Sequence, residues 1–153
     1  MITVSASTLV DDYEHIFSQD PAIEKVEDLA DRHQRYVDTG DVSHLPIRSG
    51  QKPAVFKMRH LRGSARRVLI DAVRVHDGVN MQVLGLCFRL TVRAMLDSAG
   101  QEQKFAVEHD AKCGLPLLSE NVFNQLDEID DLVNELGFRA IAELGLKKKQ
   151  SPV

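Results

Sequence analysis

Histidine and cysteine are the side chains of this chain best suited to bind a metal ion or to act as base and nucleophile. The six histidines are His15, His33, His44, His60, His76 and His109. No two of them form an HxxxH or HExxH pair, and neither Cys87 nor Cys113 has a CxxC partner. A zinc site would therefore need ligands from four separate segments. Cys113 and His109 are four residues apart, but the sequence places no orienting group on a rigid element beside them.

Carboxylates and glycines do not form a recognisable active site either. The acidic pairs Asp127-Glu128 and Asp130-Asp131 fall on a predicted helix, where such charge is usually solvated surface rather than a metal site. The chain contains no GxxxxGK[ST] or GxGxxG phosphate loop and no GxSxG nucleophile motif. The sequence therefore predicts a non-enzymatic protein with no cofactor, no metal ion and no catalytic residues.

The charged residues fall into three blocks, which the net charge of −4 conceals. Residues 1–51 contain four Lys/Arg and ten Asp/Glu, residues 52–93 contain nine and two, and residues 94–153 contain six and eleven. One interpretation is that the basic block is neutralised by its acidic flanks, within one molecule or between copies. A second is binding of a polyanion such as nucleic acid, and a third is that the pattern has no significance. The candidate polyanion contacts are Arg59, Arg62, Arg66, Arg67 and Arg74.

The first unit of the chain is predicted to be an acidic N-terminal arm, residues 1–45. Residues 2–7 alternate as a short strand or a frayed end, and a helix capped near Thr8 is expected to run to Ser18. Asp20-Pro21 is a helix-start signal, so a second helix is expected to continue to Val37. A loop over 41–52 then separates this arm from the rest of the chain.

The main domain, residues 46–146, is predicted to be mostly helical. Alternating segments predict strands near 54–61 and 103–109, which we expect to pair because a lone strand cannot satisfy its backbone groups. Helices are expected over 65–76, 79–97 and 119–144, the last with a kink or break at Gly137, followed by a basic flexible tail over 147–153. The predicted fold class is mainly α: a small helical bundle with one short two-stranded antiparallel β element. We expect no secretory signal and no membrane span.

The helix expected over 79–97 is apolar nearly all round, and a second apolar stripe follows the C-terminal helix from Val122 to Leu144. A helix with so little polar surface belongs at the centre of a bundle or in an interface between chains. We interpret the two stripes as more apolar surface than one small domain must bury, so we expect them to contact another polypeptide. The candidate partner-binding residues are Met81, Leu84, Phe88, Val92, Met95, Phe123, Leu132 and Leu136.

Several short motifs resemble those of the tail assembly chaperones of tailed phages. They are Ser49-Gly50-Gln51-Lys52-Pro53, Phe56-Lys57-Met58-Arg59-His60-Leu61, Gly114-Leu115-Pro116-Leu117, Ser119-Glu120 and the segment from Glu135-Leu136-Gly137 to Leu144. The similarity covers about residues 46–146. The acidic arm before Pro46 departs from the pattern, which leaves room for a related virion or neck protein.

The resemblance implies an assembly or structural protein without catalysis. Proteins of this group are thought to bind the tape measure protein, a long helical polypeptide, and to keep it soluble until the tail tube polymerises around it. The implied partners are a tape measure, another virion protein or further copies of this chain, in the host cytoplasm during assembly or in the virion. The alternative is a nucleic-acid-binding or host-targeting regulator that uses the basic segment 52–93.

Overall fold

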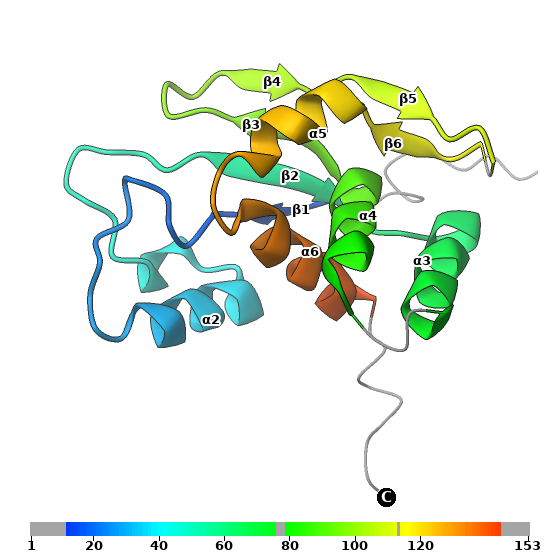
Figure 1. Ribbon diagram of the computed structural model, residues 1–153. Coiled ribbons are helices and arrows are strands. Elements are labelled where there is room, and N and C mark those ends of the chain that lie inside the picture. The colour runs from blue at the N-terminus through cyan, green and yellow to red at the C-terminus, as the bar shows by residue number, and fades with distance from the viewer. Residues whose placement is uncertain (1–11, 76–78, 113, 145–153) are drawn as a thin grey trace, which may run out of the picture.

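The computed structural model describes residues 12–75, 79–112 and 114–144, and its fold is α+β. In this part of the chain a four-stranded antiparallel sheet and a separate two-stranded hairpin accompany five α-helices. The predicted helical bundle with one short β element is therefore wrong. Figure 1 shows α4 and α6 side by side beneath the sheet, with α3 beyond α4 and α2 at the opposite end. The expected strand over 2–7 and the expected tail over 147–153 lie outside the described residues.

The main sheet has the strand order β1-β2-β3-β4. Its strands are β1 (Asp12–His15), β2 (Val55–Arg59), β3 (Val92–Leu96) and β4 (Glu102–Lys104), and the hairpin is formed by β5 (Val107–His109) and β6 (Pro116–Leu118). The strand expected near 54–61 exists as β2, but it pairs with β1 and β3 rather than with the segment 103–109. That segment divides at Phe105 between the two sheets, because β4 pairs with β3 and β5 pairs with β6.

The helices cover one face of the main sheet and both ends of the molecule. They are α2 (Leu29–Thr39), α3 (Gly63–Val75), α4 (Met81–Thr91), α5 (Glu120–Asp127) and α6 (Leu132–Glu143), with a 3-10 turn, η1, at Val42–His44. The prediction for 65–76 agrees closely with α3. The single helix expected over 119–144 is divided into α5 and α6. The helical conformation is interrupted at Asp131, whose φ is +67°, and not at Gly137, which lies inside α6.

The largest departure from the sequence prediction is the helix expected over 79–97. It ends at Thr91, and the backbone of Val92 is already extended, with φ −74° and ψ 127°. From Val92 the chain continues as β3, which alternates between buried and partly exposed residues against β2. The β-branched pair Thr91-Val92 favours this change, but a continuous apolar run does not reveal by periodicity where a helix becomes a strand.

The N-terminal prediction also changes, because Asp12–His15 is a strand rather than part of a helix. Asp20 does not cap a helix at Pro21. One of its carboxylate oxygens accepts from the amide of Ala22 at 2.8 Å and the other from the amide of Ala54 at 3.0 Å. Asp20 therefore holds a turn against the start of β2, and α2 begins only at Leu29.

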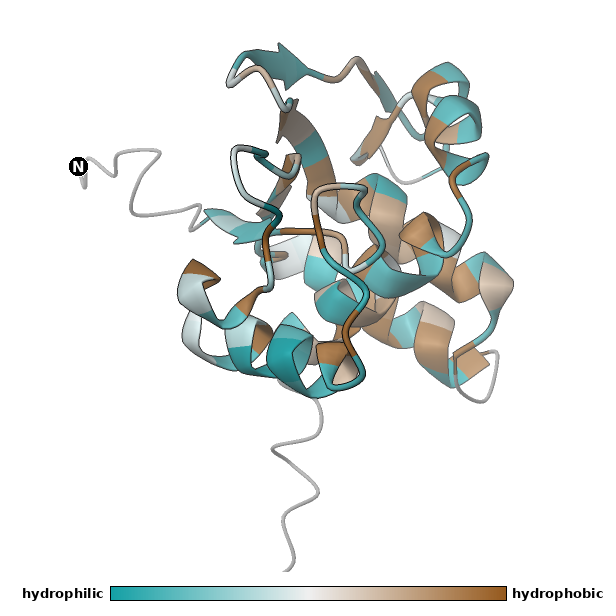
Figure 2. Ribbon diagram, turned by 90° about the vertical axis from the view of Figure 1, so that its left-hand side faces the viewer, coloured by the Kyte–Doolittle hydropathy of each residue, from teal (hydrophilic) through white to brown (hydrophobic). Residues whose placement is uncertain are grey.

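Two hydrophobic clusters stabilise the fold. The larger one lies between the sheet, α3, α4 and α6, and its fully buried side chains include Met58, Leu69, Phe88, Leu132 and Leu136. The smaller one is formed by Ile16, Ile23, Leu29, Tyr36 and Leu45 beneath α2. Figure 2 views the molecule from the α2 side, where the exposed face of that helix is largely hydrophilic. Within the described ranges, no helix is long and apolar enough to cross a membrane.

Candidate functional site

A shallow apolar groove of about 550 Å³ lies over α4, between α3 and α5. Its apolar lining includes Ala72, Met81, Gly85, Leu86, Phe123 and Val133, and Arg89 and Asp127 supply charge at its edge. Met81 is 69% exposed although it is a large apolar side chain. Because this exposed apolar side chain lies at an apolar groove, the groove is a candidate binding surface for an apolar partner.

Local sequence features position the α4 side of the groove. Asn80 caps α4 by accepting a hydrogen bond from the amide of Val83 at 2.9 Å, which places Met81 in the first, exposed turn. Gly85 has no side chain to cover the helix, so the ring of Phe123 lies 3.5 Å from where a Cβ would stand. The groove floor is therefore partly backbone of α4.

The α5 side of the groove is held by Phe123 and Arg89. Ser119 caps α5 through the amide of Val122, and the ring of Phe123 packs edge-on against Phe88 with centroids 5.8 Å apart. The Arg89 guanidinium lies 5.9 Å from the centre of the Phe123 ring. Arg89 also donates to the carbonyl of Leu118 at 2.9 Å and to Glu108 at 2.6 Å, so it fixes α5 and the hairpin to α4.

The structure separates the eight predicted partner-binding residues into three groups. Met81 and Phe123 line the groove, and Met95 is partly buried on β3, away from it. The remaining five belong to the buried core: Leu84, Phe88, Val92, Leu132 and Leu136. Sequence reasoning missed Ala72, Gly85, Leu86 and Val133, because these residues meet only when α3, α5 and α6 pack around α4.

The five arginines proposed as polyanion contacts do not act as one group. Arg59 donates to the carbonyl of Leu90 at 2.9 Å, and Arg66 donates to the carbonyl of Leu144 at 3.1 Å. These carbonyls lie at the C-terminal ends of α4 and α6, where a cation is favoured by the helix dipole. Burial lowers the pKa of Arg59 below its usual value.

The other three arginines, on and just before α3, are exposed: Arg62, Arg67 and Arg74. Arg67 contacts Ser64 at 3.4 Å, and Arg62 also has an interaction partner. Elsewhere in the basic block, Lys57 pairs with Glu102 at 3.2 Å and Arg89 pairs with Glu108. Both acidic partners come from the C-terminal block, which favours internal neutralisation of the charge pattern.

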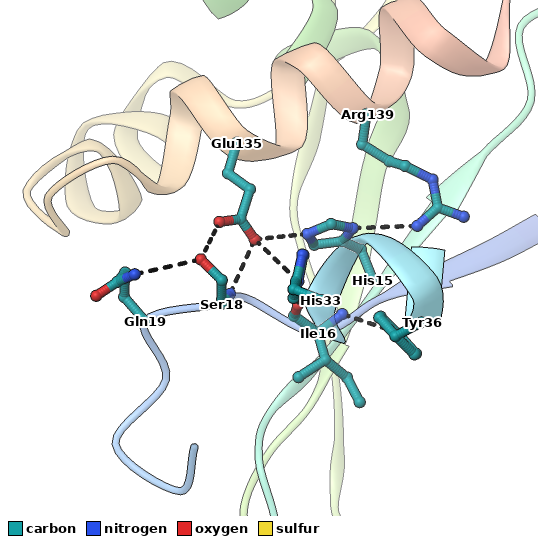
Figure 3. Close-up of polar contacts among 8 residues, drawn as sticks. All are labelled: His15, Ile16, Ser18, Gln19, His33, Tyr36, Glu135 and Arg139. Atoms are coloured by element: carbon teal, nitrogen blue, oxygen red, sulfur yellow. Dashed lines mark hydrogen bonds and ion pairs between the residues drawn. The ribbon is translucent and has the colours of Figure 1, made fainter. Parts of the chain in front are cut away.

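A second candidate site is a polar cluster that joins α6 to β1 and α2 (Figure 3). Glu135 of α6 accepts from the imidazole Nε2 of His15 at 2.7 Å and from the amide of Ser18 at 2.9 Å, and its other oxygen accepts from the Ser18 hydroxyl. His33 of α2 donates to the carbonyl of Ile16 at 2.7 Å. His15 and Glu135 are separated by 120 residues, so no local motif could have revealed this cluster.

The hydrogen bonds around His15 determine the protonation state of its ring. Arginine can only donate, so the Nη1 of Arg139, 3.1 Å from Nδ1 of His15, requires Nδ1 to be an unprotonated acceptor. The proton of the neutral ring then lies on Nε2 and is donated to Glu135. Burial lowers the pKa of His15, and the nearby Arg139 acts in the same direction, whereas contact with Glu135 opposes the shift.

His15, His33 and Glu135 each offer one ligand atom, and the three atoms lie within 4.8 Å of one another, so a metal site must be considered. The surroundings fit hydrogen bonding better than metal binding. A histidine that binds a metal through Nε2 normally donates its Nδ1 proton to a neighbouring acceptor, but here Nδ1 faces the guanidinium of Arg139. Arg139 is itself held by Glu143 at 2.9 Å and lies 4.9 Å from the ring centre of Tyr13.

The polar cluster is also poorly arranged for catalysis. The Ser18 hydroxyl donates to Glu135 rather than to a histidine. Burial alone raises the pKa of Glu135, but hydrogen bonds from His15 and Ser18 outweigh it and hold that pKa below its usual value. Such a carboxylate is a weak base and does not activate a serine. Burial raises the pKa of the Cys87 thiol to about 12, so it is not a nucleophile, and the Cys113–His109 pair involves a cysteine outside the described residues.

Comparison with models of protein families, with curated proteins and with solved structures finds no match to this chain.

Proposed function

We propose that this protein is a non-enzymatic assembly protein that binds an apolar helical segment of another polypeptide in the groove over α4. The observation that carries the proposal is the exposure of Met81 beside a floor formed by Gly85, Leu86 and Phe123. The resemblance of residues 46–146 to tail assembly chaperones suggests the partner, a tape-measure-like helical protein made during phage tail morphogenesis.

The chemistry of the groove favours an amphipathic helix over other apolar partners. A helix binds in a groove through apolar side chains spaced three and four residues apart, while its polar face stays in water. The exposed carboxylate of Asp127 at the groove edge favours a lysine or arginine beside those apolar positions. Val75, the last residue of α3, and Val79, two residues before Met81, are also exposed apolar side chains.

Co-expression with the tape measure protein of the same genome tests this proposal. We expect the two proteins to copurify, and we expect Met81→Glu to weaken the association by at least about tenfold, since it places a charge in an apolar interface. Val42→Glu is the matched control, because Val42 is also an exposed apolar residue but lies beside α2, far from the groove.

Size-exclusion chromatography with light scattering measures self-association in the same preparations. A strict monomer that retains no partner would overturn the proposal, as would a complex that Met81→Glu and Val42→Glu affect equally. The nucleic-acid alternative has less support, because Arg59 and Arg66 already contact helix ends within the chain. Filter binding at low salt, where phosphate contacts are strongest, tests that alternative directly.

A further inference from the structure

The polar cluster forms the main polar attachment between the N-terminal elements and α6. A single carboxylate, Glu135, receives hydrogen bonds from His15 and from both the amide and the hydroxyl of Ser18. On the other side of the same segment, Tyr36 accepts from the amide of Ile16 at 3.1 Å and His33 donates to its carbonyl. Residues 15–18 are thus held between α2 and α6, and the contacts on the α6 side depend on an ionised Glu135 and a neutral His15.

Four polar or ionisable side chains face the His15 ring. From α6 it faces Glu135 and Arg139, and from α2 it faces His33, with ring centroids 5.2 Å apart, and Tyr36, at 6.5 Å. On its own strand the neighbouring titratable side chains are Tyr13 and Glu14, and Glu143 pairs with Arg139 on α6.

A proton added to His15 must go to Nδ1, because Nε2 already carries one. The Arg139 N–H then points at an N–H instead of a lone pair, and two cations face each other in a site where His15 is only 2% exposed. Protonation therefore removes one hydrogen bond and adds a repulsion, and no described neighbour other than Glu135 compensates for it.

Water can reach the cluster through a cavity of about 370 Å³ between α2 and α6. His15, His33, Glu135 and Arg139 line this cavity, and the side chains of His33 and Glu135 are 11% and 21% exposed. The cavity gives protons a route to His15 without unfolding of the main core.

We propose that His15, Glu135 and Arg139 form a proton-operated clasp, closed when His15 is neutral, that releases β1 and α2 from α6 when His15 binds a proton. The clasp shares no residue with the groove over α4. Protonation would loosen the attachment of residues 15–45 to α6, while β2, β3 and the α4–α6 pair stay folded.

The expected pH window follows from the direction of the pKa shift. The pKa of His15 in the folded protein lies below 6.5, its ordinary value, because of burial. The open or unfolded state therefore binds more protons below pH 6.5, and the closed state loses stability as pH falls from 6.5 toward the folded pKa. One proton taken up on opening changes the opening equilibrium by about tenfold per pH unit.

Hydrogen exchange followed by NMR tests the clasp at single amides. Between pH 7.5 and 5.5 we expect the protection factors of the Ile16 and Ser18 amides to fall by about tenfold, while those of β2 amides stay constant. His15→Gln retains a donor for Glu135 and an acceptor for Arg139 but does not titrate, so it should abolish this fall. His109→Gln replaces an exposed histidine and should leave the fall unchanged.

Nitrogen chemical shifts of the wild-type His15 ring provide a test that needs no variant. We expect the neutral Nε2–H tautomer at pH 7.5 and titration below pH 6.5. A ring that is still protonated above pH 6.5 would overturn the proposal. So would constant protection of Ser18 across the window, or an equal fall at Ser18 and in β2, which would mean that the proton acts on the whole fold.

Discussion

Two glycines on the facing helices α4 and α6 provide a sharp test of how the structure is packed. A Cβ added at Gly137 of α6 would stand 2.9 Å from the carbonyl oxygen of Leu84 and 3.2 Å from its Cα. Both are backbone atoms of α4, so they cannot move without displacing the helix. A Cβ added at Gly85 of α4 would meet only the ring edge of Phe123, at an ordinary 3.5 Å.

The same substitution at these two positions should have opposite effects on stability. Glycine to alanine in a helix interior gains up to about 1 kcal/mol from backbone propensity alone. At Gly85 this gain should be realised, so Gly85→Ala should stabilise the protein by about 0.5–1 kcal/mol. At Gly137 an overpacked methyl group costs about 1–3 kcal/mol, and we expect a value of about 2–3 kcal/mol because the methyl group meets backbone atoms. After the propensity gain is subtracted, Gly137→Ala should be net destabilising by about 1–2 kcal/mol.

Urea denaturation measures both changes as shifts of the transition midpoint at unchanged m-value. For a chain of this length, 1 kcal/mol corresponds to a shift in Tm of about 2–4 °C, so thermal unfolding should separate the two variants clearly. If Gly137→Ala proved as stable as Gly85→Ala, the close approach of α4 and α6 at Leu84 and Gly137 would be wrong.

Three further predictions follow from burial and charge. Met81→Ser should change stability by no more than about 0.5 kcal/mol, whereas Leu136→Ala should cost about 2–5 kcal/mol, as urea unfolding of each variant will show. The pKa of Glu135 is depressed in the folded protein, so this group contributes stability that is present above pH 4.5 and lost as pH falls. Glu135→Gln should therefore destabilise the protein at pH 7 and reduce its loss of stability below pH 4.5, measured as unfolding free energy against pH. In a Cys113→Ser background, Cys87 should resist alkylation at pH 8 and react on unfolding in urea, because it is fully buried and its pKa is raised to about 12.

Local signals in the sequence predicted local structure well where one element kept one periodicity. Gly63 and Ser64 mark the start of α3, and the spacing of Leu69 and its neighbours gives that helix its buried face. The prediction failed where the chain changes from helix to strand at Val92, because the residues are mainly apolar on both sides of this point and the hydrophobic pattern does not mark where the helix ends. It failed again at 103–109, where pairing partners are set by tertiary packing rather than by the strand itself.

The polar cluster shows a different limit of sequence reasoning. His15, His33 and Glu135 each look unremarkable in their own segments, since a histidine on an apolar face or a glutamate on a helix is common. Their chemistry arises only because β1 pairs with β2 and α2 folds back beside α6. No pattern within the chain connects residue 15 to residue 135.

The all-round apolarity of α4 has a different physical explanation from the one its sequence suggested. The sheet, α3, α5, α6 and the β6 strand surround this helix, so Leu84, Cys87, Phe88 and Leu90 are buried within a single chain. Folding of the single chain therefore buries most of the apolar surface of α4, and this buried surface supports no inference about a partner. The apolar surface of α4 that stays exposed is the N-terminal turn at Met81 and the strip over Gly85, which Phe123 only partly covers. A partner helix would have to bind this narrow strip, so mutations of the buried residues of α4 should unfold the protein, and only substitutions along the strip should alter binding alone.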